Sequence, residues 1–387
     1  MLNTQQVYFN LLQFHIASCF NFLPIQVDRA RGKVRLVPDN KIWRLFYWLS
    51  CSRWIFAVSK GLQSIFSPVD LIDSPAHVVL SVGLAHVVLI MHICFIKYPE
   101  LAALSFNTLL ESGGSLIVST KTKNKRLNVQ ELVVVLLPLN SFIFPLLWLM
   151  LMLIGPKAQF FLYGSLGPTF QTPMVFYTLC WVEMFLFTFM VVNITFWHFI
   201  LALFFERCNI IIKDGIRKLE ICHSKDMLPS VRMWKVAAAC THCRKIQLLL
   251  QYFNTCFSYT VFTFKIYSIC GSIAMTSFGI LLTKTKLPIA LAYLVAGMQA
   301  ICVFAIIFQK AFTVPAGMRK YKNKILQIVK LYKLQIPRED FARRVRSIHN
   351  TGIAVGIFQK LQRSSTPVFL DFITRSIARV LIAFRYH

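Results

Sequence analysis

Glu183 is the side chain of this sequence best placed for chemistry, because it is a carboxylate inside a long apolar run and lies close to Trp181. An ionisable group in a membrane-spanning segment is costly unless it is paired, so it marks a candidate functional site. Lys60 and Lys265 lie in two other apolar runs and are the partners that we expect. A purely structural ion pair accounts for the same carboxylate equally well.

Aromatic side chains and a few polar groups occur in several apolar runs at the predicted depth of Glu183. Such a mixture suits a pocket for a small organic ligand, whereas aromatic residues alone could equally form the belt at the membrane interface. We take the pocket as our hypothesis. Its predicted members are Trp148, Tyr177, Trp181, Glu183, Tyr293 and Gln299.

The segment Pro367–Tyr386 places charged side chains on one face of a predicted helix. It is long enough to cross a hydrocarbon core of about 30 Å, and Thr366 with Pro367 forms a helix start. Asp371, Arg375 and Arg379 follow one another at a spacing of four residues. Lipid does not tolerate such a stripe, so it must face protein or a water-filled path.

The cysteines and histidines predict no metal site and no cofactor. Cys240 and Cys243, with Cys222 and His223 upstream, have a spacing that resembles a zinc site. Three alanines precede Cys240, however, and free cysteine is a common buried residue in packed helices. The histidines at positions 77, 86 and 92 are spread around one helix and do not form a cluster.

No enzyme motif is present: the sequence has no Gly-x-Ser-x-Gly, no phosphate-binding loop, no His-Glu-x-x-His and no dinucleotide fingerprint. We therefore expect a protein that is not an enzyme.

The elements that carry these residues are predicted to be membrane helices. Hydrophobic residues make up 56% of the chain, with 35 phenylalanines, and the mean hydropathy is +0.60. These values exclude a soluble globular class. We expect an all-α polytopic membrane protein with seven transmembrane helices: Ile42–Phe66, Pro75–Ile96, Glu131–Ile154, Pro173–Phe205, Tyr252–Leu282, Leu287–Phe308 and Pro367–Tyr386.

The basic residues predict the orientation of these helices. Lysine and arginine gather before the first span and in the second, fourth and sixth connections, whereas the other connections hold only Lys157, Lys284 and Lys286. The N-terminus is then cytoplasmic and the C-terminus extracellular. The net charge of +27 fits this topology, and we expect no nucleic acid as a partner.

Two cytoplasmic connections are predicted to be helical. We divide the chain into a cytoplasmic N-terminal segment, 1–41, and a membrane domain, 42–387, with cytoplasmic helical extensions at about 206–251 and 310–365. Ile212, Ile216 and Leu219 continue the fourth span without a helix breaker, and residues 318–335 have helical apolar spacing. Attachment to the inner leaflet and packing into an oligomeric hub explain these helices equally well.

The whole chain resembles the arthropod gustatory and odorant receptor superfamily. The resemblance rests on seven spans with an inside N-terminus, on long basic inner connections, on a chain that ends with its last helix, and on the entry segment FNFLPIQVDRARGKVRLVPDNKIWRLFYWL. Gustatory receptors have Thr-Tyr, five apolar residues and Gln-Phe in the last helix. Here Ser376 stands for the threonine and Phe384 matches, while Arg379 interrupts the apolar residues. The sequence is thus similar to a divergent gustatory receptor.

This resemblance implies a ligand-gated, non-selective cation channel in the plasma membrane, crossing it several times. It implies a homo- or hetero-tetramer with related receptor subunits, surrounded by membrane lipid and gated by a small-molecule ligand. The last helix would line the pore, with its charged stripe packed against neighbouring helices. The predicted pore and gate residues are Ile373, Ser376, Ile377, Val380 and Phe384. A seven-helix signalling receptor without channel activity and a small-molecule transporter are the alternatives.

Overall fold

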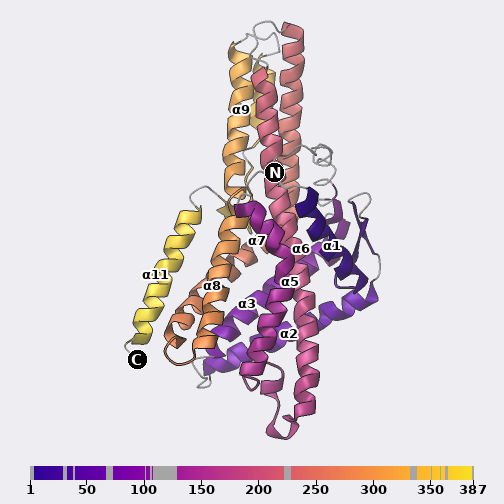
Figure 1. Ribbon diagram of the computed structural model, residues 1–387. Coiled ribbons are helices and arrows are strands. Elements are labelled where there is room, and N and C mark those ends of the chain that lie inside the picture. Colours follow the sequence, from indigo (N-terminus) through magenta and orange to yellow (C-terminus); the bar gives the residue numbers. More distant parts are fainter. Residues whose placement is uncertain are drawn as a thin grey trace. The chain divides into compact units, whose positions relative to one another are not determined.

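The computed structural model of the protein is built mostly of helices, as the all-α prediction requires. It describes residues 4–28, 33–37, 40–66, 73–100, 102–104, 107, 129–221, 228–331, 338–349, 351–357, 359–361 and 365–385. Figure 1 shows the ribbon with its labelled elements.

Each predicted span coincides with a helix. The helices are α2 (Lys41–Phe66), α3 (Asp73–Met91), α5 (Val129–Ile154), α6 (Pro173–Glu220), α7 (Pro229–Leu282), α8 (Leu287–Phe308) and α11 (Ser365–Arg385). Within the described residues, five stretches are long and apolar enough to cross a membrane, and they belong to α3, α5, α6, α7 and α8. Charged residues interrupt the apolar residues of α2 and α11. Seven crossings and the orientation of the termini therefore stay predictions.

Local capping fixes where several of these helices begin. The Asn40 side chain accepts a hydrogen bond from the backbone N–H of Trp43, 2.9 Å away, at the start of α2. Proline opens α6 and α7, where its missing N–H costs no helical hydrogen bond. The last helix begins at Ser365, two residues before the predicted Pro367, so that the proline lies in the first turn.

Smaller elements complete the chain. The helical ones are α1 (Thr4–Cys19), the π-helix η1 (His92–Lys97), the 3₁₀ turns η2 (Tyr163–Ser165), η3 (Pro168–Phe170) and η5 (Ala311–Thr313), α9 (Val314–Leu331) and α10 (Arg338–Ser347). Two antiparallel hairpins join β1 (Ile25–Asp28) to β2 (Lys33–Leu36) and β3 (Ala354–Val355) to β4 (Gln359–Lys360). The all-α prediction did not include these hairpins.

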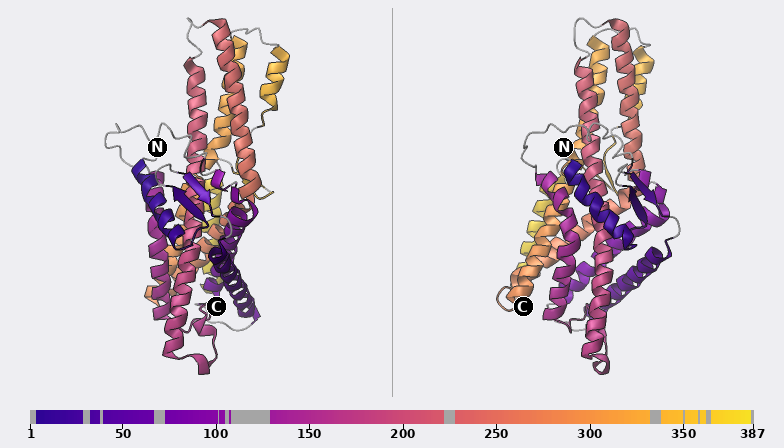
Figure 2. Two further views of the ribbon diagram at one scale, coloured as in Figure 1. Left: turned by 90° about the vertical axis from the view of Figure 1, so that its right-hand side faces the viewer. Right: turned by 45° about the vertical axis from the view of Figure 1, so that its right-hand side comes forward.

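The chain divides into two compact units. Unit 1 comprises Met1–Leu201, Thr263–Ile306 and Val368–His387. In this unit α1 packs on α5, where the Asn10 side-chain amide donates to the backbone carbonyl of Val134, 3.1 Å away. Helix α1 also lies beside the β1–β2 hairpin (Figure 2).

Unit 2 comprises Ala202–Phe262 and Ile307–Pro367, and contains the predicted helical extensions. The apolar residues Ile212, Ile216 and Leu219 at the end of α6 are buried, as the unbroken pattern predicts. Helix α9 approaches α6 closely, because Tyr321 lies against Gly215, where an added Cβ would be 2.6 Å from the tyrosine ring. The Tyr321 hydroxyl is 3.1 Å from Nδ1 of His242 on α7.

The β3–β4 hairpin is fixed to α7 within unit 2. Asn254 uses both ends of its side-chain amide: Nδ2 donates to the carbonyl of Gly352 at 2.8 Å, and Oδ1 accepts from the N–H of Ala354 at 2.9 Å. Gly356 has a φ of +60° at the turn, and its N–H donates to the Ser258 carbonyl at 2.8 Å. Residues 352–356 of the segment before α11 are thereby anchored to α7.

Candidate functional site

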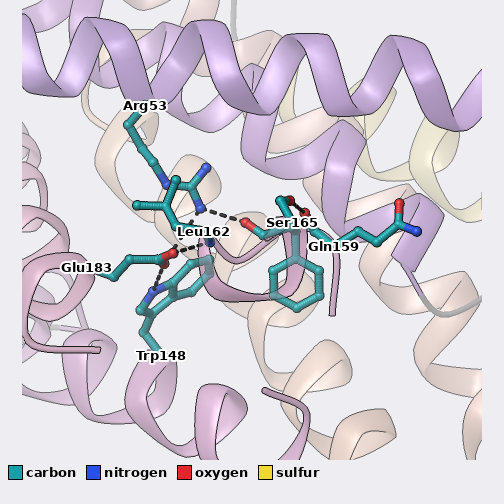
Figure 3. A network of polar contacts seen from close by, with 7 residues as sticks. Arg53, Trp148, Gln159, Leu162, Ser165 and Glu183 are labelled. Atoms are coloured by element: carbon teal, nitrogen blue, oxygen red, sulfur yellow. Dashed lines mark hydrogen bonds and ion pairs between the residues drawn. The ribbon is translucent and has the colours of Figure 1, made fainter. Parts of the chain in front are cut away.

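A buried ion pair between Arg53 and Glu183 is the centre of the candidate site in unit 1. Arg53 Nη2 lies 3.6 Å from Glu183 Oε2, and both side chains are almost fully buried. The same nitrogen donates to the backbone carbonyl of Phe160 at 2.6 Å. The other carboxylate contacts are donations from Trp148 Nε1 at 3.2 Å and from the backbone N–H of Leu162 at 2.5 Å. Figure 3 shows this network.

Three helices and one connection supply these groups. Arg53 comes from the middle of α2, Trp148 from α5, Leu162 from the connection between α5 and α6, and Glu183 from α6. Each segment contributes a donor or acceptor that would otherwise lack a partner in an apolar interior. The carboxylate is therefore paired and hydrogen-bonded, which is the condition under which a buried charge persists.

An aromatic cluster adjoins the ion pair. Trp148 stacks on Phe187 with ring centroids 4.7 Å apart, meets Phe161 edge-on at 5.1 Å, and lies near Phe160. The buried members of the cluster are Ala76, Trp148, Met152, Phe160, Phe161, Cys180, Leu282, Ala290 and Tyr293. This part of unit 1 offers an apolar, mainly aromatic surface next to one charged pair.

A small cavity of about 10 Å³ lies between the ion pair and α3. Its walls include Arg53, Trp148, Glu183 and Leu80, and its size suits a single water molecule. Arg53 Nη1 is buried without a hydrogen-bond partner among the described residues. A buried donor without a partner is stabilised when an acceptor binds to it. This place in the cluster can therefore bind a polar acceptor atom.

The structure brings together only part of the predicted pocket. Trp148, Glu183 and Tyr293 are buried in or beside the cluster. Tyr177 and Trp181 are 63% and 78% exposed and lie on the outer face of α6, away from the cluster. Gln299 is half-buried on α8 and does not belong to the cluster.

Sequence reasoning missed Arg53, which takes the place that we expected a lysine to occupy. Lys60 instead lies beside Gln63, with Nζ 3.2 Å from Oε1. The signal was available, since Arg53 lies near the centre of a predicted span and a charge there requires a partner. Phe160 was also missed, because its segment carries no helical pattern.

The three histidines at positions 77, 86 and 92 have different surroundings. His77 lies near Phe160, His86 contacts Thr263 and His92 contacts Tyr47, so the three rings occupy different places. Among the described residues no three potential metal-binding side chains come together. Cys222 and His223 of the zinc-like spacing lie outside the described residues.

The last helix turns its apolar stripe towards its own unit. Figure 1 shows α11 alongside α8, and Phe369 stacks on Phe304 with centroids 4.3 Å apart. Ile373 is 2% exposed, and Phe384 contacts Phe278. The other predicted pore residues, Ser376, Ile377 and Val380, are half-buried.

The charged stripe of α11 lies on the exposed face, which is the reverse of the expected arrangement within one protomer. Arg375 Nε is 2.9 Å from Asp371 Oδ1, and both side chains are more than half exposed. Arg379 is exposed as well. The reason is that the phenylalanines of α7 and α8 offer the apolar side of this amphipathic helix a better surface within the same unit.

Known structures provide a comparison for the whole chain. The insect olfactory receptor OR5 from Machilis hrabei, in complex with eugenol, matches with a TM-score of 0.65 over 98% of this chain and 97% of that one, at 12% sequence identity. A second structure of OR5 matches with a TM-score of 0.62 over 95% and 99%, also at 12% identity. No family model and no curated protein matches the sequence. The protein therefore has the fold of an insect olfactory receptor, over nearly its full length.

Proposed function

We propose that this protein is a chemosensory receptor of the gustatory type, acting as a ligand-gated, non-selective cation channel in the plasma membrane. The observation that carries the proposal is the match to OR5 over nearly the whole of both chains. The solved OR5 complex contains eugenol, a small organic molecule. We assign the protein no enzymatic activity.

The ligand site that we propose is the aromatic cluster beside the ion pair. Trp148, Tyr293 and Phe160 would contact the apolar part of a ligand, and Arg53 Nη1 would donate to an acceptor atom. Because Glu183 already neutralises the arginine, a neutral ligand fits better than an anion. A ligand larger than one water must displace cluster side chains, and binding would thereby favour one conformation over another.

The proposed assembly is a homo- or hetero-tetramer of related subunits, with α11 lining a central pore. Support comes from the exposed charged face of α11, which lipid would not accommodate and which therefore suits water or another subunit. Ile373 faces its own unit, whereas the other proposed gate residues, Ser376, Ile377, Val380 and Phe384, remain partly accessible. The N-terminus would be cytoplasmic, the C-terminus outside, and the extensions 206–251 and 310–365 cytoplasmic.

Expression in oocytes tests the proposal. Panels of soluble tastants and of volatile compounds should evoke cation currents in cells that express the protein and display it at the surface. Currents should be altered by Phe384→Ala and reduced by Trp148→Ala, while the exposed Tyr177→Ala serves as a control with the wild-type response. Surface-displayed protein without any evoked current, or with currents that no substitution in α11 affects, would exclude the pore assignment.

The topology needs its own test, because a signalling receptor without channel activity would place the N-terminus outside. An epitope tag at residue 1 should become accessible to antibody only after the cells are permeabilised. Labelling of intact cells would favour the alternative receptor class.

A further inference from the structure

A second hollow of unit 1 lies on the other side of Arg53, between α2 and α6. This groove has a volume of about 570 Å³, within the range of small-molecule sites. The side chains that matter here are Phe46, Leu49 and Phe56 from α2 and Trp181, Val182 and Phe185 from α6. Phe46 of α2 lies next to Phe185 of α6, with ring centroids 5.0 Å apart, so the groove lies where these two helices meet.

The groove offers hydrocarbon and almost no polar atoms, although Arg53 and Ser52 lie in its wall. The Arg53 guanidinium points away, towards Glu183 and the Phe160 carbonyl, and its Cζ lies 5.1 Å from the Phe56 ring. The Ser52 hydroxyl donates to the Trp48 carbonyl at 3.1 Å. The groove therefore exposes few polar groups to a charged or strongly polar occupant, since Arg53 Nη1 is itself buried.

The rim of the groove is exposed and apolar. Leu49, Trp181, Val182 and Phe185 all present large apolar side chains at the surface. In water such a patch would be costly, whereas in a bilayer it meets lipid chains. An apolar, open-sided hollow of this volume in this setting matches the chemistry of an acyl chain.

We propose that the groove between α2 and α6 is a binding site for one acyl chain of a membrane phospholipid. This binding site goes beyond the proposed function. It rests on one part of that proposal, the placement of α2 and α6 in the membrane, and not on channel activity. The bound chain covers the outer side of Arg53, keeps water from the Arg53–Glu183 pair and so maintains the low local dielectric constant in which the pair is strong. It also links the two helices that carry the pair.

Native mass spectrometry of the purified full chain tests this site. The protein is extracted, exchanged into detergent and given dioleoylphosphatidylcholine at a low molar ratio. Wild-type protein should retain one phospholipid per protomer, and Val182→Trp, which fills the groove, should lose it. Val295→Trp is the matched control, since Val295 is an exposed valine on α8 outside the groove, and it should retain the lipid.

Fluorescence gives a second measurement that needs no disruptive variant. Phosphatidylcholine with brominated chains should quench wild-type tryptophan emission, and part of this quenching should persist after dilution into unbrominated detergent. Trp181→Phe should abolish the persistent part, because Trp181 lines the groove. Equal lipid retention by Val182→Trp and the control, no persistent quenching, or retention of small apolar compounds in place of a phospholipid would each overturn the proposal.

Discussion

Removing one member of the buried ion pair should destabilise the protein strongly, and removing both should not. At 3.6 Å and an effective dielectric constant of about 20, the attraction between Arg53 and Glu183 is about 4 to 5 kcal/mol before desolvation is subtracted. In Glu183→Gln the buried guanidinium loses its counter-charge and keeps only neutral acceptors, among them the Phe160 carbonyl. We expect a loss of about 3 to 5 kcal/mol in the free energy of unfolding.

The reverse variant should be less severe. In Arg53→Gln the carboxylate still accepts hydrogen bonds from Trp148 and Leu162. The double variant Arg53→Gln with Glu183→Gln leaves two neutral amides that can bond to each other. It should be more stable than the Glu183→Gln variant by about 2 kcal/mol or more, which is a coupling typical of groups in one network.

The assay is unfolding by sodium dodecyl sulfate in mixed micelles, followed by circular dichroism, for all four proteins of the cycle. Glu220→Gln provides a matched control, because Glu220 is more than half exposed and lies 4.0 Å from Lys324. It should change the stability by less than about 1 kcal/mol. The reasoning fails if Glu183→Gln is as stable as the control, or if the double variant is no more stable than Glu183→Gln.

Three other substitutions test further parts of the structure. Gly215→Ala should cost about 1 to 3 kcal/mol in unfolding free energy, since the added Cβ would meet the rigid Tyr321 ring at 2.6 Å. Gly167→Ala is the control and should have little effect, because Gly167 has open space around it. Equal stabilities of the two variants would contradict this packing. Asn254→Ala should cost about 1 to 3 kcal/mol because two backbone groups of the β3–β4 segment lose their partner; unchanged hydrogen exchange of that segment would argue against the anchor. Phe384→Ala should increase basal current by weakening the proposed gate, and an unaltered open probability would remove Phe384 from it.

Long apolar periodicity was enough to predict the main helices and the continuation of α6. Ile212, Ile216 and Leu219 kept helical spacing although Gly215 lies among them, and the helix indeed continues to Glu220. The hairpins were not predictable in the same way. Strands β3 and β4 have two residues each, too few to show an alternating pattern, and Asn254 on a distant helix holds their segment.

The candidate site was only partly predictable. Glu183 stood out because a lone carboxylate in an apolar run has few explanations. Its neighbours were chosen by depth in the membrane, a criterion that ignores direction around the helix. Trp181 and Glu183 are two residues apart, which is about 200° around a helix, and so they point to opposite sides. Arg53 required knowledge of which helices pair, and that depends on tertiary contacts.

The ion pair also has a consequence for how the chain is made. In the seven-span arrangement that we propose, α2 is the first helix to enter the membrane during synthesis. Its length and composition, however, do not place it among the five stretches that are apolar enough to cross a membrane. An arginine near the centre of a helix opposes insertion by about 2.5 to 3.5 kcal/mol. Glu183 is synthesised only after α3 and α5. Arg53 is therefore unpaired until Glu183 has been synthesised. A nascent chain that ends before α6 should hold α2 in the membrane only weakly, and such a chain should be a target of cellular quality control.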